Sequence, residues 1–164
     1  WWSTNGDVLQ LQLLSHGTGT FQGGPANLGS FDWDNPEGPV SVLFAPLPVA
    51  AVENLALRLD RVPVDAGATV ITQGEPGDRF YVIDDGELEV HVDDALRRVM
   101  GPGDCFGEIA LLHEVPRTAT VRAIGAGTLY ALDSDEFIAS VTGDPRALRA
   151  ADGVIGERID ATGA

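Results

Sequence analysis

The chain has 164 residues, 44% of them hydrophobic, which is enough for one domain with a hydrophobic core. Its net charge of −15 makes nucleic acid an unexpected partner, because most of the surface would repel a phosphate backbone. No apolar run approaches the ~20 residues that span a bilayer and no secretion signal opens the chain, so we expect a soluble, cytoplasmic protein or the cytoplasmic portion of a membrane protein, with no membrane insertion of its own.

Residues 1–40 differ in composition from the remainder. They are rich in glycine, contain no arginine and show neither helical nor strand periodicity. We therefore expect residues 1–40 to be an arm or linker and residues 41–164 to form the domain.

Regular patterns begin near residue 46. Val52, Leu55 and Leu59 recur at helical spacing and predict a helix over about 48–60. Short β-prone runs follow up to about residue 135, each ended by Gly, Asp or Pro, which predicts a small antiparallel β-barrel or jelly roll. The pair Asp85-Gly86 lies between two alternating runs and predicts a hairpin at that point.

The end of the chain returns to helical spacing. "SDEFIASV" begins with Ser and Asp capping candidates, and the next segment has Asp144 as a candidate N-cap and Pro145 in the first turn. Gly153 and Gly156 are unfavourable inside this second helix, which predicts a mobile or broken helix. The predicted fold class is mostly β, with an N-terminal helix, a short helix within the β region and C-terminal helices.

The stretch "FGEIALLHEVPRTAT", residues 106–120, carries the clearest chemistry. Gly107 allows a ligand to approach the backbone, and the amides of the following short helix suit an anion. Arg117 offers the planar donor fork that phosphate oxygens accept in pairs. Glu108 would repel a phosphate but can accept a hydrogen bond from a sugar hydroxyl. Together these residues predict a sugar phosphate ligand.

The same stretch resembles the phosphate-binding cassette of cyclic-nucleotide-binding domains, such as those of cAMP-dependent protein kinase regulatory subunits, bacterial catabolite activators and cyclic-nucleotide-gated channels. That cassette reads F-G-E-(L/I)-A-L and then P-R-(A/T/S)-A-(T/S), and it is intact here over Phe106–Leu111 and Pro116–Thr120. The resemblance covers about residues 46–160 and implies a regulatory domain that couples nucleotide occupancy to an effector.

The resemblance implies a role for each cassette residue. Arg117 would bind the cyclic phosphate with Asp78 as its brace, and Glu108 with the Gly107 amide would bind the ribose 2′-hydroxyl. The Ala110 and Thr118 amides would also contact the phosphate. The implied ligand-binding residues are Gly107, Glu108, Ile109, Ala110, Arg117, Thr118 and Ala119. The family's C-terminal helix, here residues 145–159, would cover the base, with Val154, Ile155 or Arg158 as the lid residue.

Thr118 bears on the choice of nucleotide. In the family, a threonine here can bond the 2-amino group of guanine but also occurs in cAMP-responsive proteins. Because the basic residues are all arginine, a bias that a GC-rich bacterial genome would produce, we favour cAMP and expect some cGMP binding. Beyond this nucleotide we expect no cofactor.

The same residues allow other interpretations. Individually, Glu108 could favour a helix dipole and Arg117 could form a surface ion pair. A domain of this fold without ligand, serving protein interaction or dimerisation, is the main alternative. A metal enzyme is disfavoured because His16, His91 and His113 are scattered, and Cys105 lacks a recognisable base, so we expect no catalysis. The effector would lie outside this chain, in a membrane transporter or another fused domain, or in a partner protein.

Overall fold

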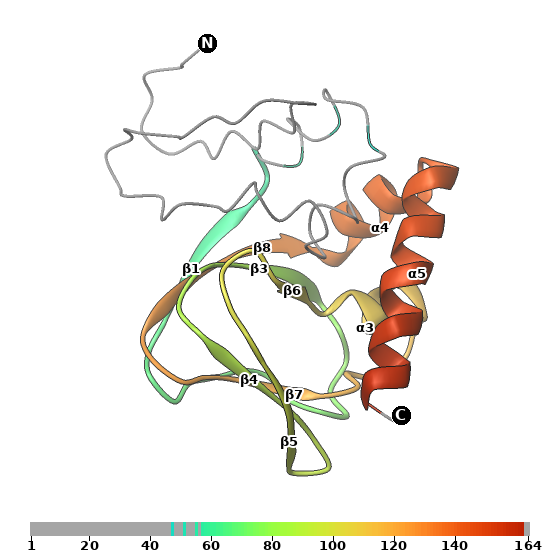
Figure 1. Ribbon diagram of the computed structural model, residues 1–164. Coiled ribbons are helices and arrows are strands. Elements are labelled where there is room, and N and C mark those ends of the chain that lie inside the picture. The colour runs from blue at the N-terminus through green and yellow to red at the C-terminus, as the bar shows by residue number, and fades with distance from the viewer. Residues whose placement is uncertain (1–46, 48–50, 52–54, 56, 163–164) are drawn as a thin grey trace, which may run out of the picture.

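The computed structural model describes residues 47, 51, 55 and 57–162. In this part of the chain, two four-stranded antiparallel sheets face each other (Figure 1). The first sheet has the strand order β1 (Asp60–Val64), β8 (Gly127–Asp133), β3 (Arg79–Asp85) and β6 (Cys105–Phe106). The second has the order β2 (Thr69–Ile71), β7 (Thr120–Ala123), β4 (Leu88–Val92) and β5 (Ala95–Met100). The mostly β, antiparallel jelly-roll prediction is confirmed, but the two sheets do not close into a barrel.

The first sheet is buried on both faces. Along β3, Phe80 packs toward the helices, whereas Tyr81 and Ile83 pack between the sheets. This alternation arises because successive side chains of a strand point to opposite faces of the sheet. The core between the sheets also holds Leu88, Met100, Val121 and Leu129. Each fully buried side chain of this size contributes roughly 1.5–3 kcal/mol, so this double-sided packing fixes the position of β3 and of the segments that flank it.

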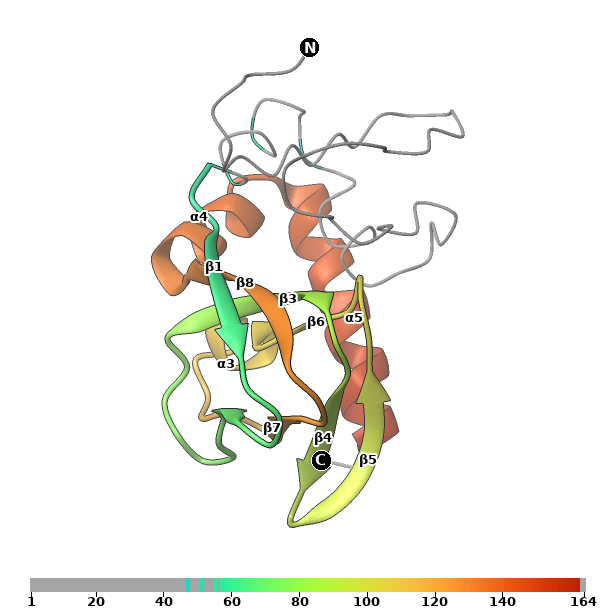
Figure 2. The ribbon, with the colours of Figure 1, turned by 90° about the vertical axis from the view of Figure 1, so that its left-hand side faces the viewer.

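The helices lie on one side of the two sheets: α3 (Glu108–Leu112), α4 (Ser134–Thr142) and α5 (Pro145–Thr162). Figure 2 views the sheets from the opposite side, with these helices behind them. The rings of Phe80 on β3 and Phe137 on α4 stack with centroids 4.4 Å apart. The Asp144 carboxylate accepts a 2.7 Å hydrogen bond from the Arg146 amide, which confirms the predicted N-cap of α5.

Two expectations about the helices need revision. The helix α5 is continuous through Gly153 and Gly156, because tertiary packing outweighs their low helix propensity. Of the helix expected over 48–60, Ala51 and Leu55 are helical, the chain turns at 57–58, and the strand β1 begins at Asp60. The remainder of that segment and the expected arm, residues 1–40, lie outside the described residues.

The predicted hairpin at Asp85-Gly86 is wrong. Strand β3 pairs with β8 and β6, whereas β4 pairs with β5 and β7, so the turn carries the chain from one sheet to the other. Gly86 does have the positive φ expected there, 96°, and a Cβ on it would lie 3.1 Å from the Gly127 Cα. The glycine therefore serves a close crossing of two segments and not a two-strand turn.

The described hairpin joins β4 to β5 instead. Its two turn residues, Asp93 and Asp94, have φ of 51° and 62°, the double positive φ of a type I′ turn. The Gln73 side chain bonds both the carboxylate and the amide of Asp93, which ties this hairpin to the end of β2. Strand β5 is thereby held at the edge of the second sheet, where it borders the site described below.

Candidate functional site

Gly107 connects the two-residue strand β6 to the helix α3. Strand β6 pairs with β3 through Tyr81↔Phe106 and Val82↔Cys105, which fixes where α3 begins. Gly107 has a φ of 95°, and a Cβ on it would lie 2.7 Å from Arg117 Nη1 and 2.8 Å from the Arg79 carbonyl oxygen. Only glycine permits this backbone conformation at so close an approach to an arginine.

Arg117 is buried, with 3% of its surface exposed, and is held by three hydrogen bonds. Nη1 donates to the Gly107 carbonyl oxygen at 3.0 Å, while Nη2 donates to the Arg79 carbonyl oxygen at 2.8 Å and to Asp78 Oδ1 at 3.1 Å. A guanidinium has five N–H donors, so these bonds leave about two for a ligand. Asp78 thus contacts Arg117, as the family resemblance implies, although its own side chain is largely exposed.

The Arg117 backbone is fixed as well. Its amide donates to the Glu75 carbonyl oxygen and its carbonyl accepts from the Gly74 amide, each at 2.8 Å. Both ends of the residue are therefore anchored to the loop that leads into β3. An arginine anchored in this way presents its remaining donors in one orientation, which favours the paired acceptor oxygens of a phosphate.

Glu108 is the first residue of α3 and is only 1% exposed. Its Oε1 accepts a hydrogen bond from Nη1 of Arg158, which comes from α5. Burial of a carboxylate is costly unless it is paired, and this partner supplies the compensating charge. A carboxylate has about four acceptor positions, so Glu108 can accept a hydrogen bond from a ligand hydroxyl in addition to the one from Arg158.

These side chains line one cavity of about 760 Å³, within the usual range of roughly 300–1,000 Å³ for small-molecule sites. All of the residues predicted to bind ligand contribute to its wall: Gly107, Glu108, Ile109, Ala110, Arg117, Thr118 and Ala119. Asp78 lies behind Arg117 and is not part of the wall. The structure therefore brings the predicted set together, with the carboxylate and the guanidinium facing the same space.

Most residues of the opposite wall were not predicted from the sequence. It comes from the second sheet, through Ile71, Val90, Arg98, Met100 and Val121, and from α5, through Arg149, Ala150, Gly153, Val154, Glu157 and Arg158. Of the three lid candidates, Val154 and Arg158 line the cavity, whereas Ile155 is buried in the protein and is not part of the wall. The helical spacing of 150, 153, 154, 157 and 158 is a signal that could have identified this face of α5.

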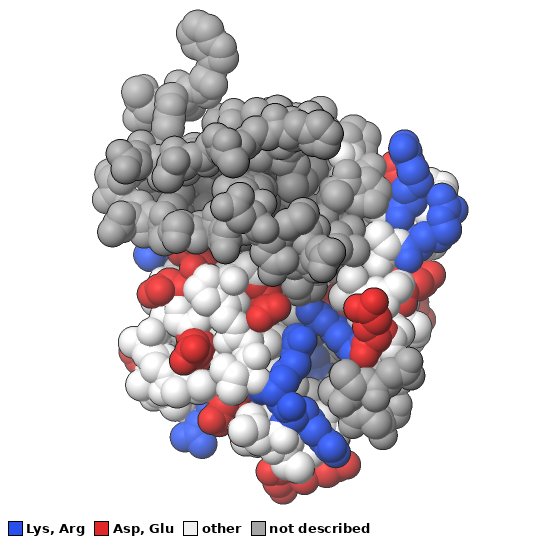
Figure 3. Space-filling model, in the orientation of Figure 1, with Lys and Arg blue, Asp and Glu red and all other residues white. Residues whose placement is uncertain are grey.

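The net charge of the residues around the cavity has the opposite sign to that of the whole chain. Four arginines and three carboxylates line it, a net charge of +1 in a protein of net charge −15. Figure 3 shows basic side chains gathered between β5 and α5. Burial, together with the charge of Arg158, lowers the pKa of Arg98 below its usual value. A cavity with this surplus favours a small anion over a cation or a neutral ligand.

The described residues contain no group of three or more His, Cys, Asp or Glu side chains positioned for a metal ion. The imidazole of His91 pairs with Glu89 on the same strand, and His113 ends α3 at the surface. None of the helices in the described part of the chain has the length and apolarity needed to cross a lipid bilayer.

We expect Cys105 to resist thiol reagents. It is fully buried, and burial raises the pKa of its thiol to about 12, so the reactive thiolate is scarce at neutral pH. Labelling of the folded protein with a chromogenic disulfide at pH 8 should be far slower than labelling in urea. Equal rates under the two conditions would contradict this assignment, and Cys105→Ala provides the blank.

Comparison with known proteins places these features in a family. The family model for the cyclic nucleotide-binding domain matches residues 61–142, half of the chain. A cAMP-dependent protein kinase regulatory subunit of Mycosarcoma maydis is 41% identical over 113 residues, which cover 59% of this chain and 22% of that protein. An uncharacterised protein of Mycobacterium tuberculosis is 39% identical over 128 residues, which cover 76% of this chain and 25% of that protein.

Among solved structures, the regulatory domain of Toxoplasma gondii PKA, crystallised with cAMP, superimposes with a TM-score of 0.57 at 32% identity. The superposition covers 66% of this chain and 45% of that one. The chain spans about a quarter of the length of the curated relatives that it matches. With the cassette, the cavity and the two-sheet fold in agreement with the family match, this chain belongs to the cyclic nucleotide-binding domain family.

Proposed function

We propose that this domain binds a cyclic nucleotide, cAMP in the first place, and that occupancy regulates an effector joined to it. The observation that carries the proposal is the cavity in which a buried arginine with unused donors faces a buried carboxylate. A cyclic nucleotide carries one phosphate charge and one ribose 2′-hydroxyl, which match these two groups. Its single negative charge also matches the net charge of +1 around the cavity.

Each cassette residue has a proposed role. Arg117 binds the cyclic phosphate, with Asp78 bracing the guanidinium from behind. Glu108 and the Gly107 amide bind the ribose 2′-hydroxyl. Ile109 and Ala119 complete the wall, and the amides of Ala110 and Thr118 bind phosphate oxygens. A threonine at 118 also provides a hydroxyl for the 2-amino group of guanine, so we expect measurable cGMP binding, although we favour cAMP as the ligand.

The regulatory part of the proposal is supported by the length of the relatives. The segment that matches this chain is about a quarter of each relative, which is typical of a binding module within a larger protein. The proposed effector is a domain fused to this one, such as a membrane transporter or another domain. The chain's single thiol, Cys105, fits a reducing compartment and supports a cytoplasmic location. The proposed role is binding without catalysis, so cAMP should be recovered unchanged after incubation with the protein.

Titration calorimetry tests the binding. We expect one cAMP per chain, measurable binding of cGMP, and little binding of 5′-AMP, whose dianionic open phosphate does not suit a site with one surplus positive charge. A folded protein that binds neither cyclic nucleotide would reject the proposal and favour a domain of this fold that acts through protein contacts alone.

A further inference from the structure

Gln73, which follows β2, joins three parts of the domain. Its side-chain Oε1 accepts a hydrogen bond from the Asp93 amide at 2.8 Å, and its Nε2 donates to Asp93 Oδ1 at 3.0 Å. Its own backbone amide donates to Thr120 Oγ1 at 3.0 Å, at the end of the cassette. The next residue, Gly74, donates to the Arg117 carbonyl oxygen at 2.8 Å. The segment 73–74 therefore connects the β4–β5 hairpin with the loop that carries Arg117.

The contact between Gln73 and Asp93 requires a neutral side-chain amide. The turn presents one donor, the Asp93 amide, beside one acceptor, the Asp93 carboxylate. Asn and Gln carry an acceptor and a donor on the same carbon without a net charge, so such a side chain satisfies both groups. A second carboxylate at position 73 would face Asp93 Oδ1 and repel it. The contact therefore depends on the amide group and not on attraction between charges.

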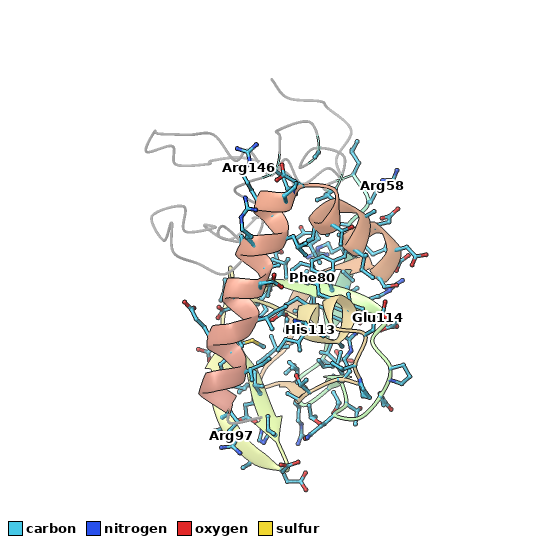
Figure 4. All side chains as sticks on the ribbon, turned by 90° about the vertical axis from the view of Figure 1, so that its right-hand side faces the viewer. Arg58, Phe80, Arg97, His113, Glu114 and Arg146 are labelled. Atoms are coloured by element: carbon cyan, nitrogen blue, oxygen red, sulfur yellow. The ribbon has the colours of Figure 1, made fainter. Side chains whose placement is uncertain are left out.

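Little packing holds the far end of the β4–β5 hairpin. Residues 93–97 are all exposed, and Figures 1 and 2 show the connection between β4 and β5 projecting beyond the rest of the sheets. Figure 4 shows Arg97 on this projecting part. A segment with few buried contacts opens at a low free-energy cost. The two hydrogen bonds of Gln73 should therefore have a large share in holding this end of the hairpin in place.

The same hairpin contributes to the wall of the cavity that lies opposite the cassette. Val90 on β4 and both Arg98 and Met100 on β5 line the cavity. A ligand whose phosphate is bound by Arg117 meets this wall with the remainder of its structure. On the proposed function, that remainder is the base of the nucleotide. The position of the hairpin relative to Arg117 then sets the space that is left for the base.

We propose that Gln73 is a positioning residue for ligand binding, which fixes the β4–β5 wall at a set distance from Arg117 and thereby fits the cavity to the size of the base. The effect on ligand selection rests on the proposed function, whereas the tie between Gln73 and the hairpin does not. A large base reaches further along the wall than a small one. Binding of a purine nucleotide should therefore depend on Gln73 more than binding of a pyrimidine nucleotide does.

The test uses Gln73→Glu, which places a second carboxylate beside that of Asp93. In the double variant with Asp93→Asn the roles are exchanged, because the new asparagine donates to the new carboxylate. Gln73→Glu with Asp94→Asn is the matched control: it has the same net charge, and Asp94 is an exposed residue of the same turn whose side chain is not a partner of Gln73. Asparagine tolerates the positive φ of both turn positions, 51° and 62°. Circular dichroism and urea unfolding check that each variant is folded.

Titration calorimetry compares cAMP with cCMP, whose base has one ring in place of two. The preference for cAMP over cCMP should fall at least about threefold in Gln73→Glu, the effect of about one lost hydrogen bond. It should return to within about twofold of the wild-type value with Asp93→Asn and not with Asp94→Asn. A purely structural role would weaken both nucleotides equally, and such an unchanged preference would overturn the proposal. Equal behaviour of the two double variants would also overturn it, because net charge would then account for the effect.

Amide hydrogen exchange without nucleotide tests the tie independently of any ligand. Amides of residues 93–97 should exchange at least about tenfold faster in Gln73→Glu than in wild type, while those of residues 129–132 in β8 change little. Equal exchange of residues 93–97 in the two proteins would show that Gln73 does not hold the hairpin. If wild type binds no cyclic nucleotide, the proposed function fails together with the effect on ligand selection, but the exchange result still decides whether Gln73 holds the hairpin.

Discussion

Replacing Arg117 by methionine should weaken cAMP binding by at least about 100-fold. About two donors of the guanidinium remain for the phosphate, and hydrogen bonds to charged groups are worth roughly 1.5–3 kcal/mol each. The substitution also removes the donors to two backbone carbonyl oxygens, those of Gly107 and Arg79. Stability should therefore fall by about 2–5 kcal/mol as well, so calorimetry must be paired with urea unfolding.

Two further variants separate binding from stability. Arg117→Lys keeps the charge but not the planar fork, so it should bind cAMP more tightly than Arg117→Met and more weakly than wild type. Arg122→Met is the control, because Arg122 is exposed on β7 and does not line the cavity. Unchanged affinity in a folded Arg117→Met protein would mean that the phosphate binds elsewhere.

Replacing Gly107 by alanine should destabilise the domain by about 2–5 kcal/mol. The positive φ of 95° costs a residue with a Cβ about 1–2 kcal/mol, and overpacking adds about 1–3 kcal/mol. The new methyl group would lie 2.7 Å from Arg117 Nη1 and 2.8 Å from the Arg79 carbonyl oxygen, so the guanidinium must move. Binding of cAMP should then fall with stability, as urea unfolding and calorimetry on the folded fraction would show.

Gly103→Ala supplies the matched control. Gly103 has a similar φ of 85°, but a Cβ there would meet no atom within 4 Å, so only the conformational cost of about 1–2 kcal/mol applies. It lies in the turn before β6 and does not line the cavity, so cAMP affinity should be retained. Equal losses of stability in the two variants would show that the close approach of Arg117 to Gly107 has no energetic consequence.

The cassette could be read from the sequence because its chemistry is local. Gly107, Glu108 and Arg117 lie within eleven consecutive residues, so they belong to one short helix, its N-cap and the loop that follows it. Arg98 and Arg158 reach the same cavity only because β5 lies at the edge of the second sheet and α5 packs across the opening. Helical spacing can identify the face of α5 to which Arg158 belongs, but the position of that face against the cavity depends on tertiary packing.

The incorrect predictions about the fold have similar causes. Asp85-Gly86 correctly indicated a turn with positive φ, but a turn does not reveal which sheet the next strand joins. The true hairpin turn, Asp93-Asp94, was missed because non-glycine residues rarely adopt positive φ. Strand β6 has only two residues, too few for any periodicity. The continuity of α5 reflects packing against α4, which outweighs propensity.

The place of β8 in the first sheet has a consequence for how the domain acquires its shape. Strand β8 lies between β1 and β3, and it pairs Asp60 with Ala131, residues at opposite ends of the β region. The sheet therefore cannot assemble until the chain has been synthesised through Asp133, and its formation must close long loops first. Folding should be slow for a domain of this size, and during synthesis the segments that make up the cavity should remain open to proteases and chaperones until the last strand arrives.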